Sequence, residues 1–147
     1  MRALIQRVAR ASVSVDGAVV SRINKGLLVL IGIKDGDTQE DADFITKKLL
    51  DLRLFESEKS FVDKSIKDLD LEVLFVSQFT LYANCRKGNR PSFDKAMNPK
   101  DAKIFYENFV KNFKTKWPRV YDGVFGAEMQ VELVNYGPAT ILLESEK

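Results

Sequence analysis

The sequence contains no histidine, and this absence restricts its chemistry more than any other feature of the composition. Histidine is the side chain best suited to general base catalysis near neutral pH. Its absence excludes Ser-His-Asp and Cys-His catalytic sites and most zinc sites. If the chain is an enzyme, catalysis must come from carboxylates, hydroxyls, backbone N–H groups that bind an oxyanion, or a reactive group on the substrate.

Cysteine and long hydrophobic runs are also scarce. The single cysteine, Cys85, cannot form an internal disulfide or a cysteine-based metal cluster, which is compatible with a reducing compartment. The longest apolar run, 27–33, is far shorter than the roughly 20 residues of a membrane-spanning helix. The opening MRALIQRVAR alternates apolar and polar residues, unlike a signal peptide. We therefore expect a cytoplasmic protein with no membrane partner, no metal and no cofactor.

The remaining composition is that of a globular protein. Hydrophobic residues make up 45% and charged residues 30% of the 147 positions, which is enough for the core of one domain. The net charge of +2 is too small to indicate a nucleic-acid-binding protein by itself, so the positions of the basic residues matter more than their number.

The segment 71–83, LEVLFVSQFTLYA, combines an apolar run with polar side chains. Residues 73–76 are typical of a strand buried on both faces, and Ser77, Gln78, Phe79 and Thr80 follow. A buried polar group without a partner costs on the order of 1–3 kcal/mol, so these groups pair internally or line a cleft. As a strand, the segment would point Gln78 and Thr80 to one face. The alternative, ordinary strand residues bonded to neighbouring backbone, stays equally open.

Two helices and several strands are predicted elsewhere. Residues 39–51 form a helix capped by Asp37 or Thr38, whose acidic first turn we interpret as capping and not as a metal site. A second helix begins after Asn98 and ends at Pro118, with an aromatic stripe that we assign to the core. Predicted strands cover 2–8, 11–15, 18–23, 26–33, 52–55, 120–125, 129–134 and 141–143. The fold class is therefore α/β of the α+β type: a single domain, 1–147, with a mostly antiparallel, barrel-like sheet and two main helices packed on it.

Two segments, 84–95 and 135–140, each allow two interpretations. The loop 84–95, NCRKGNRPSFDK, contains Arg86, Lys87 and Arg90 beside the suspected cleft, with Phe93 available for stacking on a base. The alternative is a solvated basic loop. The segment NYGPAT, 135–140, has a proline that must lie at an edge, a bulge or a tight turn; it could also be a simple connecting turn.

Several motifs resemble one protein family. SQFTL at 77–81 and NYGPAT at 135–140 resemble the two signature motifs of the D-aminoacyl-tRNA deacylases. Further similarity lies in MRALIQRV at 1–8, LRLF at 52–55, GNRPSF at 88–93 and GVFGAEM at 123–129, so the resemblance spans essentially the whole chain. One departure is Ala139, where the family usually has valine; this change should leave the loop intact but alter its packing.

The resemblance implies a homodimer that hydrolyses the ester between a D-amino acid and the terminal adenosine of tRNA. It implies a cis Gly-Pro bond that reaches into the partner's pocket, where its backbone oxygens hold the substrate's amino group. Gly137 and Pro138 would then exclude L side chains while tolerating glycine, and Phe125 and Met129 would also bind substrate. Arg86, Lys87 and Arg90 would bind tRNA.

The catalytic set implied by the resemblance is Ser77, Gln78, Phe79 and Thr80. Backbone N–H groups near Phe79 and Thr80 are the natural oxyanion donors, with the Gln78 side chain as a second candidate. Thr80 could be a nucleophile, but no histidine or obvious lysine is available to activate it. We therefore prefer a mechanism in which the 2′-hydroxyl of the terminal ribose positions or deprotonates the water, while Thr80 shapes the pocket.

Two other function classes remain open from the sequence. A non-catalytic RNA-binding module that uses the basic loop predicts salt-sensitive tRNA binding without ester cleavage. A non-chiral esterase of small substrates predicts activity without tRNA and no effect of Pro138.

Overall fold

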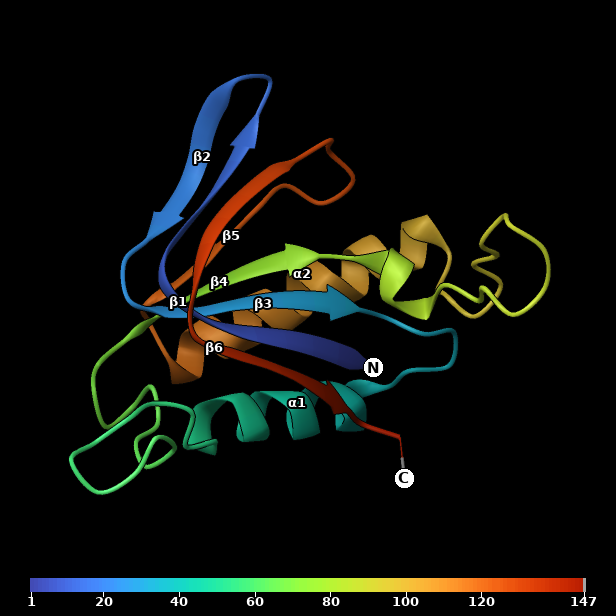
Figure 1. Cartoon of the computed structure of the whole chain (residues 1–147). Coiled ribbons are helices and arrows are strands. Elements are labelled where there is room, and N and C mark those ends of the chain that lie inside the picture. The colour runs from blue at the N-terminus through green and yellow to red at the C-terminus, as the bar shows by residue number, and fades with distance from the viewer. Residues whose placement is uncertain (147) are drawn as a thin grey trace.

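One mixed sheet with two long helices makes up the computed structural model, which describes residues 1–146 (Figure 1). The sheet order is β2-β1-β3-β4-β5, and β6 pairs with the other side of β1. Three pairings, β1 with β2, β3 and β6, are antiparallel, whereas β3–β4 and β4–β5 are parallel. The elements are β1 (Arg2–Val15), β2 (Ala18–Ile23), β3 (Gly26–Gly32), α1 (Gln39–Asp51), β4 (Glu72–Ser77), the 3-10 helix η1 (Phe79–Tyr82), α2 (Pro99–Lys116), β5 (Val120–Asp122) and β6 (Gln130–Glu144).

The predicted α+β class with a barrel-like sheet is confirmed, and strands β3 and β4 explain it physically. Both strands are buried on two faces, so successive side chains enter two different cores. Val29 and Phe75 belong to the core shared with both helices, while Leu28 and Leu74 belong to a second core against β1 and β2. The second core forms because the sheet curls over on itself.

Both long helices begin where the sequence predicts. The Asp41 carboxylate accepts the Thr38 N–H at 2.8 Å, and this backbone hydrogen bond lowers the pKa of Asp41. The Asn98 side chain accepts the Asp101 N–H at 3.1 Å at the start of α2. The aromatic stripe of α2 does pack in the core, where the Phe75 ring meets two of its rings edge-on: those of Phe109 and Phe113 at 5.2 and 4.9 Å.

The N-terminal strand is longer than predicted. The sequence indicates strands 2–8 and 11–15, but β1 continues through both because different neighbours pair with its two halves. Residues 2–8 of β1 pair with β3, and residues 11–15 pair with β2. β6 runs along the opposite side of β1 and curves with it, with register shifts between Gln6 and Val8 and between Val8 and Arg10.

Three other expectations are wrong in part, and one alternative that the sequence left open is excluded. β4 ends at Ser77, so residues 79–82 are a 3-10 helix and not a strand. Residues 52–55 form no strand, only an isolated bridge from Phe55 to Lys64. β5 ends at Asp122, before the predicted residue 125. The NYGPAT segment lies inside β6 at the register shift and is not a connecting turn, which agrees with the expectation of an edge or bulge.

No helix in residues 1–146 is long and apolar enough to cross a membrane.

Candidate active site

A pocket of about 570 Å³ opens where β4 ends. Three segments supply its walls: the end of β4 with the start of η1, the chain entering α2, and the loop before β6. Its lining residues are Val76, Ser77, Gln78, Phe79, Phe93, Ala96, Met97, Asn98, Pro99, Ala102, Phe125, Gly126, Ala127, Met129 and Val131. The structure thus brings together Ser77, Gln78, Phe79, Phe125 and Met129 from the predicted set.

The turn from β4 into η1 creates one side of this pocket. The last β4 pairing joins Ser77 to Ile31, after which the Gln78 N–H donates to the Ile31 carbonyl at 2.7 Å. Beyond this point β3 ends at Gly32, where an added Cβ would lie 2.9 Å from the Leu81 Cβ. Glycine at position 32 therefore allows η1 to fold directly across the end of β3, which a strand-only interpretation of 71–83 could not anticipate.

The polar groups predicted near the pocket form a small network. The Gln78 side-chain amide donates a short hydrogen bond to the Thr80 hydroxyl. Gln78 lines the pocket, whereas Thr80 does not. The N–H groups of Phe79 and Thr80 are the first two of η1 and have no acceptor within that helix. Of the two residues, Phe79 lines the pocket and Thr80 follows it directly in the chain.

The lining contains no titratable side chain. Its polar side chains are a serine, a glutamine and an asparagine, none of which can act as a general base near neutral pH. Such a pocket can orient a ligand and stabilise negative charge through N–H donors. Within residues 1–146, the lining itself supplies no proton acceptor of this kind.

Aromatic and thioether side chains form the remaining walls. Phe79 is 57% exposed at the rim, and its ring meets that of Phe93 edge-on at 5.0 Å. Phe125 and Met129 are half-buried, and the Phe125 ring lies 5.7 Å from that of Tyr106. Burial raises the pKa of the Tyr106 hydroxyl, which therefore stays protonated. This lining suits a flat apolar group such as a base or an aromatic amino acid.

The basic loop lies next to the pocket, as predicted. A bridge between Asn84 and Ser92 closes the loop, and Phe93 immediately after it lines the cavity. Arg86, Lys87 and Arg90 are all exposed, and none of the three forms an ion pair within residues 1–146.

Gly137 and Pro138 do not line the pocket of their own chain. They lie in β6 at its register shift with β1, are exposed, and are joined by a cis peptide bond. Gly137 has φ of 120°, a conformation that L side chains rarely adopt. A Cβ at this position would also overlap the Arg7 guanidinium.

Arg7 anchors this part of β6 and was missed in the sequence. Its side chain is only 1% exposed, and its Nε donates to the Tyr136 carbonyl at 2.9 Å. A second nitrogen donates to the Leu54 carbonyl at 2.8 Å, and the guanidinium lies 4.1 Å from the centre of the Phe61 ring. Strand alternation offered a signal, because Arg7 shares its face with buried Ile5, and a buried arginine needs a function or a partner.

We name the group of Arg7, Glu56, Lys25 and Tyr136 the β6 anchor. The Glu56 carboxylate accepts hydrogen bonds from Lys25 Nζ and the Tyr136 hydroxyl, each at 3.0 Å, and lies 3.5 Å from Arg7. A hydrogen bond from its own backbone N–H, followed by the bonds from Lys25 and Tyr136, lowers the pKa of Glu56 to about 2. The Glu56 carboxylate is therefore charged throughout the physiological range.

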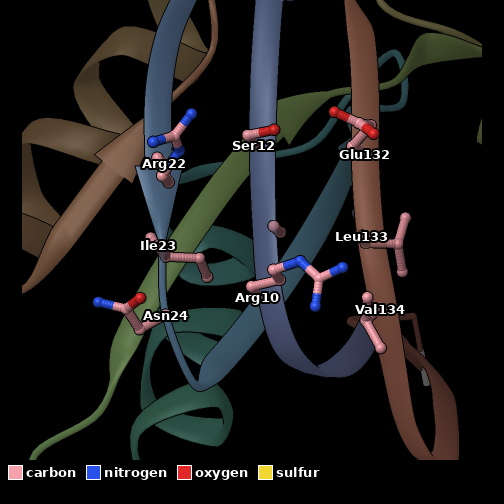
Figure 2. A pocket seen from close by; sticks show the side chains of 9 residues that line it. Arg10, Ser12, Arg22, Ile23, Asn24, Glu132, Leu133 and Val134 are labelled. Atoms are coloured by element: carbon pink, nitrogen blue, oxygen red, sulfur yellow. The ribbon is translucent and has the colours of Figure 1, made fainter.

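A second hollow, of about 340 Å³, lies across β2, β1 and β6 (Figure 2). Arg22, Ser12 and Glu132 occupy adjacent positions on these three strands, and Arg10 lies two residues before Ser12. None of the predicted site residues lines this hollow, whereas five of them line the first pocket.

The family model and two of the relatives that match this chain are all described as tRNA deacylases. A family model described as D-Tyr-tRNA(Tyr) deacylase matches residues 4–144. A D-aminoacyl-tRNA deacylase from Clostridium novyi (strain NT) is 49% identical, over 100% of this chain and 99% of the relative. A relative of the same name from Aquifex aeolicus (strain VF5) is 50% identical over the same shares.

Two solved structures are also similar. One described as "c-Myc DNA Unwinding Element Binding Protein" has a TM-score of 0.95 and 44% identity, covering 100% of both chains. Another, described as a probable eukaryotic D-amino acid tRNA deacylase, shares the fold with a TM-score of 0.83 at 18% identity, over 97% of this chain and 98% of the other.

Proposed function

The chain belongs to the D-aminoacyl-tRNA deacylase family of ester hydrolases, and from this we propose how its pocket works. We propose that it cleaves the ester between a D-amino acid and the terminal adenosine of tRNA, which releases the free D-amino acid and the tRNA. The 2′-hydroxyl of that adenosine assists the attacking water. The family match over residues 4–144 supports the ester cleavage most strongly, and a pocket lining without a titratable side chain supports the assistance by the 2′-hydroxyl.

The chemical steps follow from that lining. Water attacks the ester carbonyl, and the oxygen becomes negatively charged in the transition state. The N–H groups of Phe79 and Thr80, with the Gln78 amide as a second candidate, stabilise this oxyanion. Because the pocket supplies no base, the 2′-hydroxyl positions or deprotonates the water. As the carbonyl re-forms, the bond to the ribose 3′-oxygen breaks, and the proton lost by the water passes through the 2′-hydroxyl to that departing oxygen.

Thr80 shapes the pocket in this mechanism. Its hydroxyl accepts from the Gln78 amide and so holds that side chain in place; the amide is a hydrogen-bond donor and cannot activate a nucleophile. Ser77 lies at the pocket wall at the end of β4 and contributes a polar contact to the ligand.

A second copy of the chain supplies the chirality filter. Gly137 and Pro138 are exposed and absent from their own pocket, so they are available to a partner. Within residues 1–146, β6 pairs only with β1, leaving its other edge open. Exposed apolar side chains along β6, Val134, Ile141 and Leu142, favour burial against that partner.

In the homodimer, the backbone of Gly137 and Pro138 meets the partner's pocket between Phe79 and the wall of Phe125 and Met129. Backbone oxygens hold the substrate's amino group, and an L side chain would be directed at the same backbone and excluded. Glycine has no side chain to exclude, so glycyl-tRNA is also a substrate. The filter works by rejection and not by recognition of a particular side chain.

The loop with Arg86, Lys87 and Arg90 binds the phosphates near the tRNA 3′ end. Its side chains are exposed, unpaired within residues 1–146 and next to the pocket. A relative described as a DNA-unwinding-element-binding protein also supports a nucleic-acid-binding surface on this fold. An aminoacylated tRNA substrate is consistent with a cytoplasmic location of the enzyme.

The test is deacylation of D-tyrosyl-tRNA and L-tyrosyl-tRNA, side by side, by the purified protein. Rapid loss of the D ester with the L ester spared supports both the reaction and the filter. Cleavage of both esters retains the reaction and removes the filter. Binding without cleavage of either would contradict the proposal and favour a non-catalytic RNA-binding module.

A further inference from the structure

Glu56 holds the residue that precedes Gly137 at two separate points. Its carboxylate accepts the Tyr136 hydroxyl directly at 3.0 Å. It also lies 3.5 Å from Arg7, whose Nε donates to the Tyr136 carbonyl at 2.9 Å. Both the side chain and the backbone of Tyr136 are therefore fixed relative to one carboxylate.

Arg7 depends on this carboxylate. Its guanidinium is buried, and within residues 1–146 Glu56 is the one acidic side chain that pairs with it. One guanidinium nitrogen is buried without a hydrogen-bond partner, so the remaining contacts do not saturate the group. Three backbone carbonyls, those of Tyr136, Leu54 and Phe61, accept hydrogen bonds from the guanidinium, and Glu56 supplies the opposite charge that compensates its burial.

Lys25 completes the arrangement from another segment. Its Nζ donates to Glu56 at 3.0 Å and lies 5.5 Å from the centre of the Tyr136 ring. The carboxylate consequently ties the loop between β2 and β3 to β1 and β6. The charged side chains of Glu56, Arg7 and Lys25 therefore hold the exposed segment 136–138 in place. None of these three residues lines the ester-cleaving pocket.

We propose that Glu56 is a positioning residue for chiral selection: through Arg7 and Tyr136 it fixes the backbone that excludes L-aminoacyl esters. This inference rests on the proposed function, in which the Gly137 and Pro138 backbone enters the partner's pocket. A displacement of about 1 Å in a positioned group is enough to change rates substantially. Loosening the segment therefore admits L side chains while leaving the oxyanion donors of the pocket untouched.

The test is Glu56→Gln, assayed with D- and L-tyrosyl-tRNA under single-turnover conditions. The amide keeps the shape but places N–H donors opposite Arg7 and Lys25. We expect the L-to-D rate ratio to rise about tenfold, equivalent to ~1.4 kcal/mol in the difference between the two barriers. The rise should come mainly from faster L cleavage; the D rate should fall to a smaller extent, because the same backbone oxygens hold the amino group of the D substrate.

Glu72→Gln is the matched control. Glu72 is a second glutamate that pairs with an arginine: it lies 4.0 Å from Arg119 and accepts the Asn24 N–H at 3.2 Å, but has no contact with segment 136–138. It is buried, whereas Glu56 is half-buried. The control variant should lower thermal stability without changing the L-to-D ratio. A merely structural role of Glu56 would make the two variants behave alike.

Tyr136→Phe provides a second, milder variant should Glu56→Gln fold poorly. It removes only the hydroxyl that donates to Glu56 and should raise the L-to-D ratio about threefold. In the double variant the effects should be less than additive, because both changes break the same contact.

An unchanged L-to-D ratio in folded Glu56→Gln or Tyr136→Phe would overturn the role of Glu56, as would an equal change in Glu72→Gln. If the wild-type protein nevertheless cleaves D-tyrosyl-tRNA and spares the L ester, the proposed function is unaffected by that variant result. A wild-type protein that cleaves neither ester would overturn both.

Discussion

The pocket and the β6 anchor differ in almost every physical property. The pocket is open at its rim, mostly apolar and free of titratable side chains. The β6 anchor brings two cationic side chains, a carboxylate and a phenol hydroxyl within hydrogen-bonding or ion-pairing distance, with Arg7 buried at its centre.

This difference separates two tasks. A reaction in which the substrate supplies the base needs from the protein only a shaped cavity with oriented N–H donors. A filter that rejects one stereoisomer needs a rigid backbone, and charge-assisted hydrogen bonds provide rigidity. We therefore expect variants of the anchor to change stability and selectivity, and variants of the pocket to change binding and turnover.

The largest expected effect is that of Arg7→Met on stability. The variant removes hydrogen bonds to the carbonyls of Tyr136 and Leu54 from a buried position and should cost roughly 3–5 kcal/mol of unfolding free energy, measured by urea denaturation. Arg10→Met, on the same strand but exposed, should change it by less than about 0.5 kcal/mol. Equal effects would remove the distinction between the anchor and an ordinary surface.

Phe79→Ala should weaken substrate binding with little loss of stability. The ring is 57% exposed and packs mainly on Phe93, and a stacked base contributes about 1–3 kcal/mol. We expect a higher KM for D-tyrosyl-tRNA and an unchanged thermal midpoint, with Phe44→Ala on α1 as an exposed aromatic control. A lower thermal midpoint with unchanged KM would contradict the assignment of Phe79 to the ligand.

Thr80→Ala should lower turnover only modestly. Loss of the hydrogen bond from Gln78 is worth about 1 kcal/mol, or roughly fivefold in rate, and Thr80→Ser should restore the activity because it keeps the hydroxyl. Complete loss of turnover with tight binding of the tRNA end would instead indicate a nucleophile. Single-turnover rates and binding of the tRNA end, measured together, separate the two roles.

The smallest expected effect is the pH dependence of the anchor. The folded pKa of Glu56, about 2, lies below its ordinary value of 4.5, so its contribution to stability is present above pH 4.5 and lost as the pH falls toward 2. The difference in thermal midpoint between wild type and Glu56→Gln should stay constant from pH 8 to about pH 5 and shrink below about pH 4.5. A difference that changes near pH 7 would contradict the assigned charge state.

Local patterns predicted most of the fold. Thr38 and Asn98 begin their helices as expected because capping depends on a few adjacent residues. The apolar run of β4 was recognisable because a strand buried on both faces lacks polar alternation. The end of β4 was not predictable, since it depends on Gly32 in another strand allowing η1 to approach.

The site was predictable to a smaller extent. Ser77 and Gln78 were expected at a cleft because polar residues interrupt an apolar run, and both line the pocket. Phe79 was expected only from the family resemblance. Phe125 and Met129 were expected only from the family resemblance, since nothing in their local pattern indicates a pocket wall. The roles of Glu56 and Arg7 were not predicted because their contact joins distant segments. The arginine on the apolar face of a strand did indicate that a partner was needed.

The most direct test of the account is the rate of deacylation of D-tyrosyl-tRNA that ends in 2′-deoxyadenosine, compared with the normal 3′ end. A pocket without a titratable side chain depends on the substrate hydroxyl, so we expect a loss of at least ~100-fold in turnover with binding largely retained. Turnover of the deoxy substrate within about threefold of the normal rate would show that the protein supplies the base and would contradict the account.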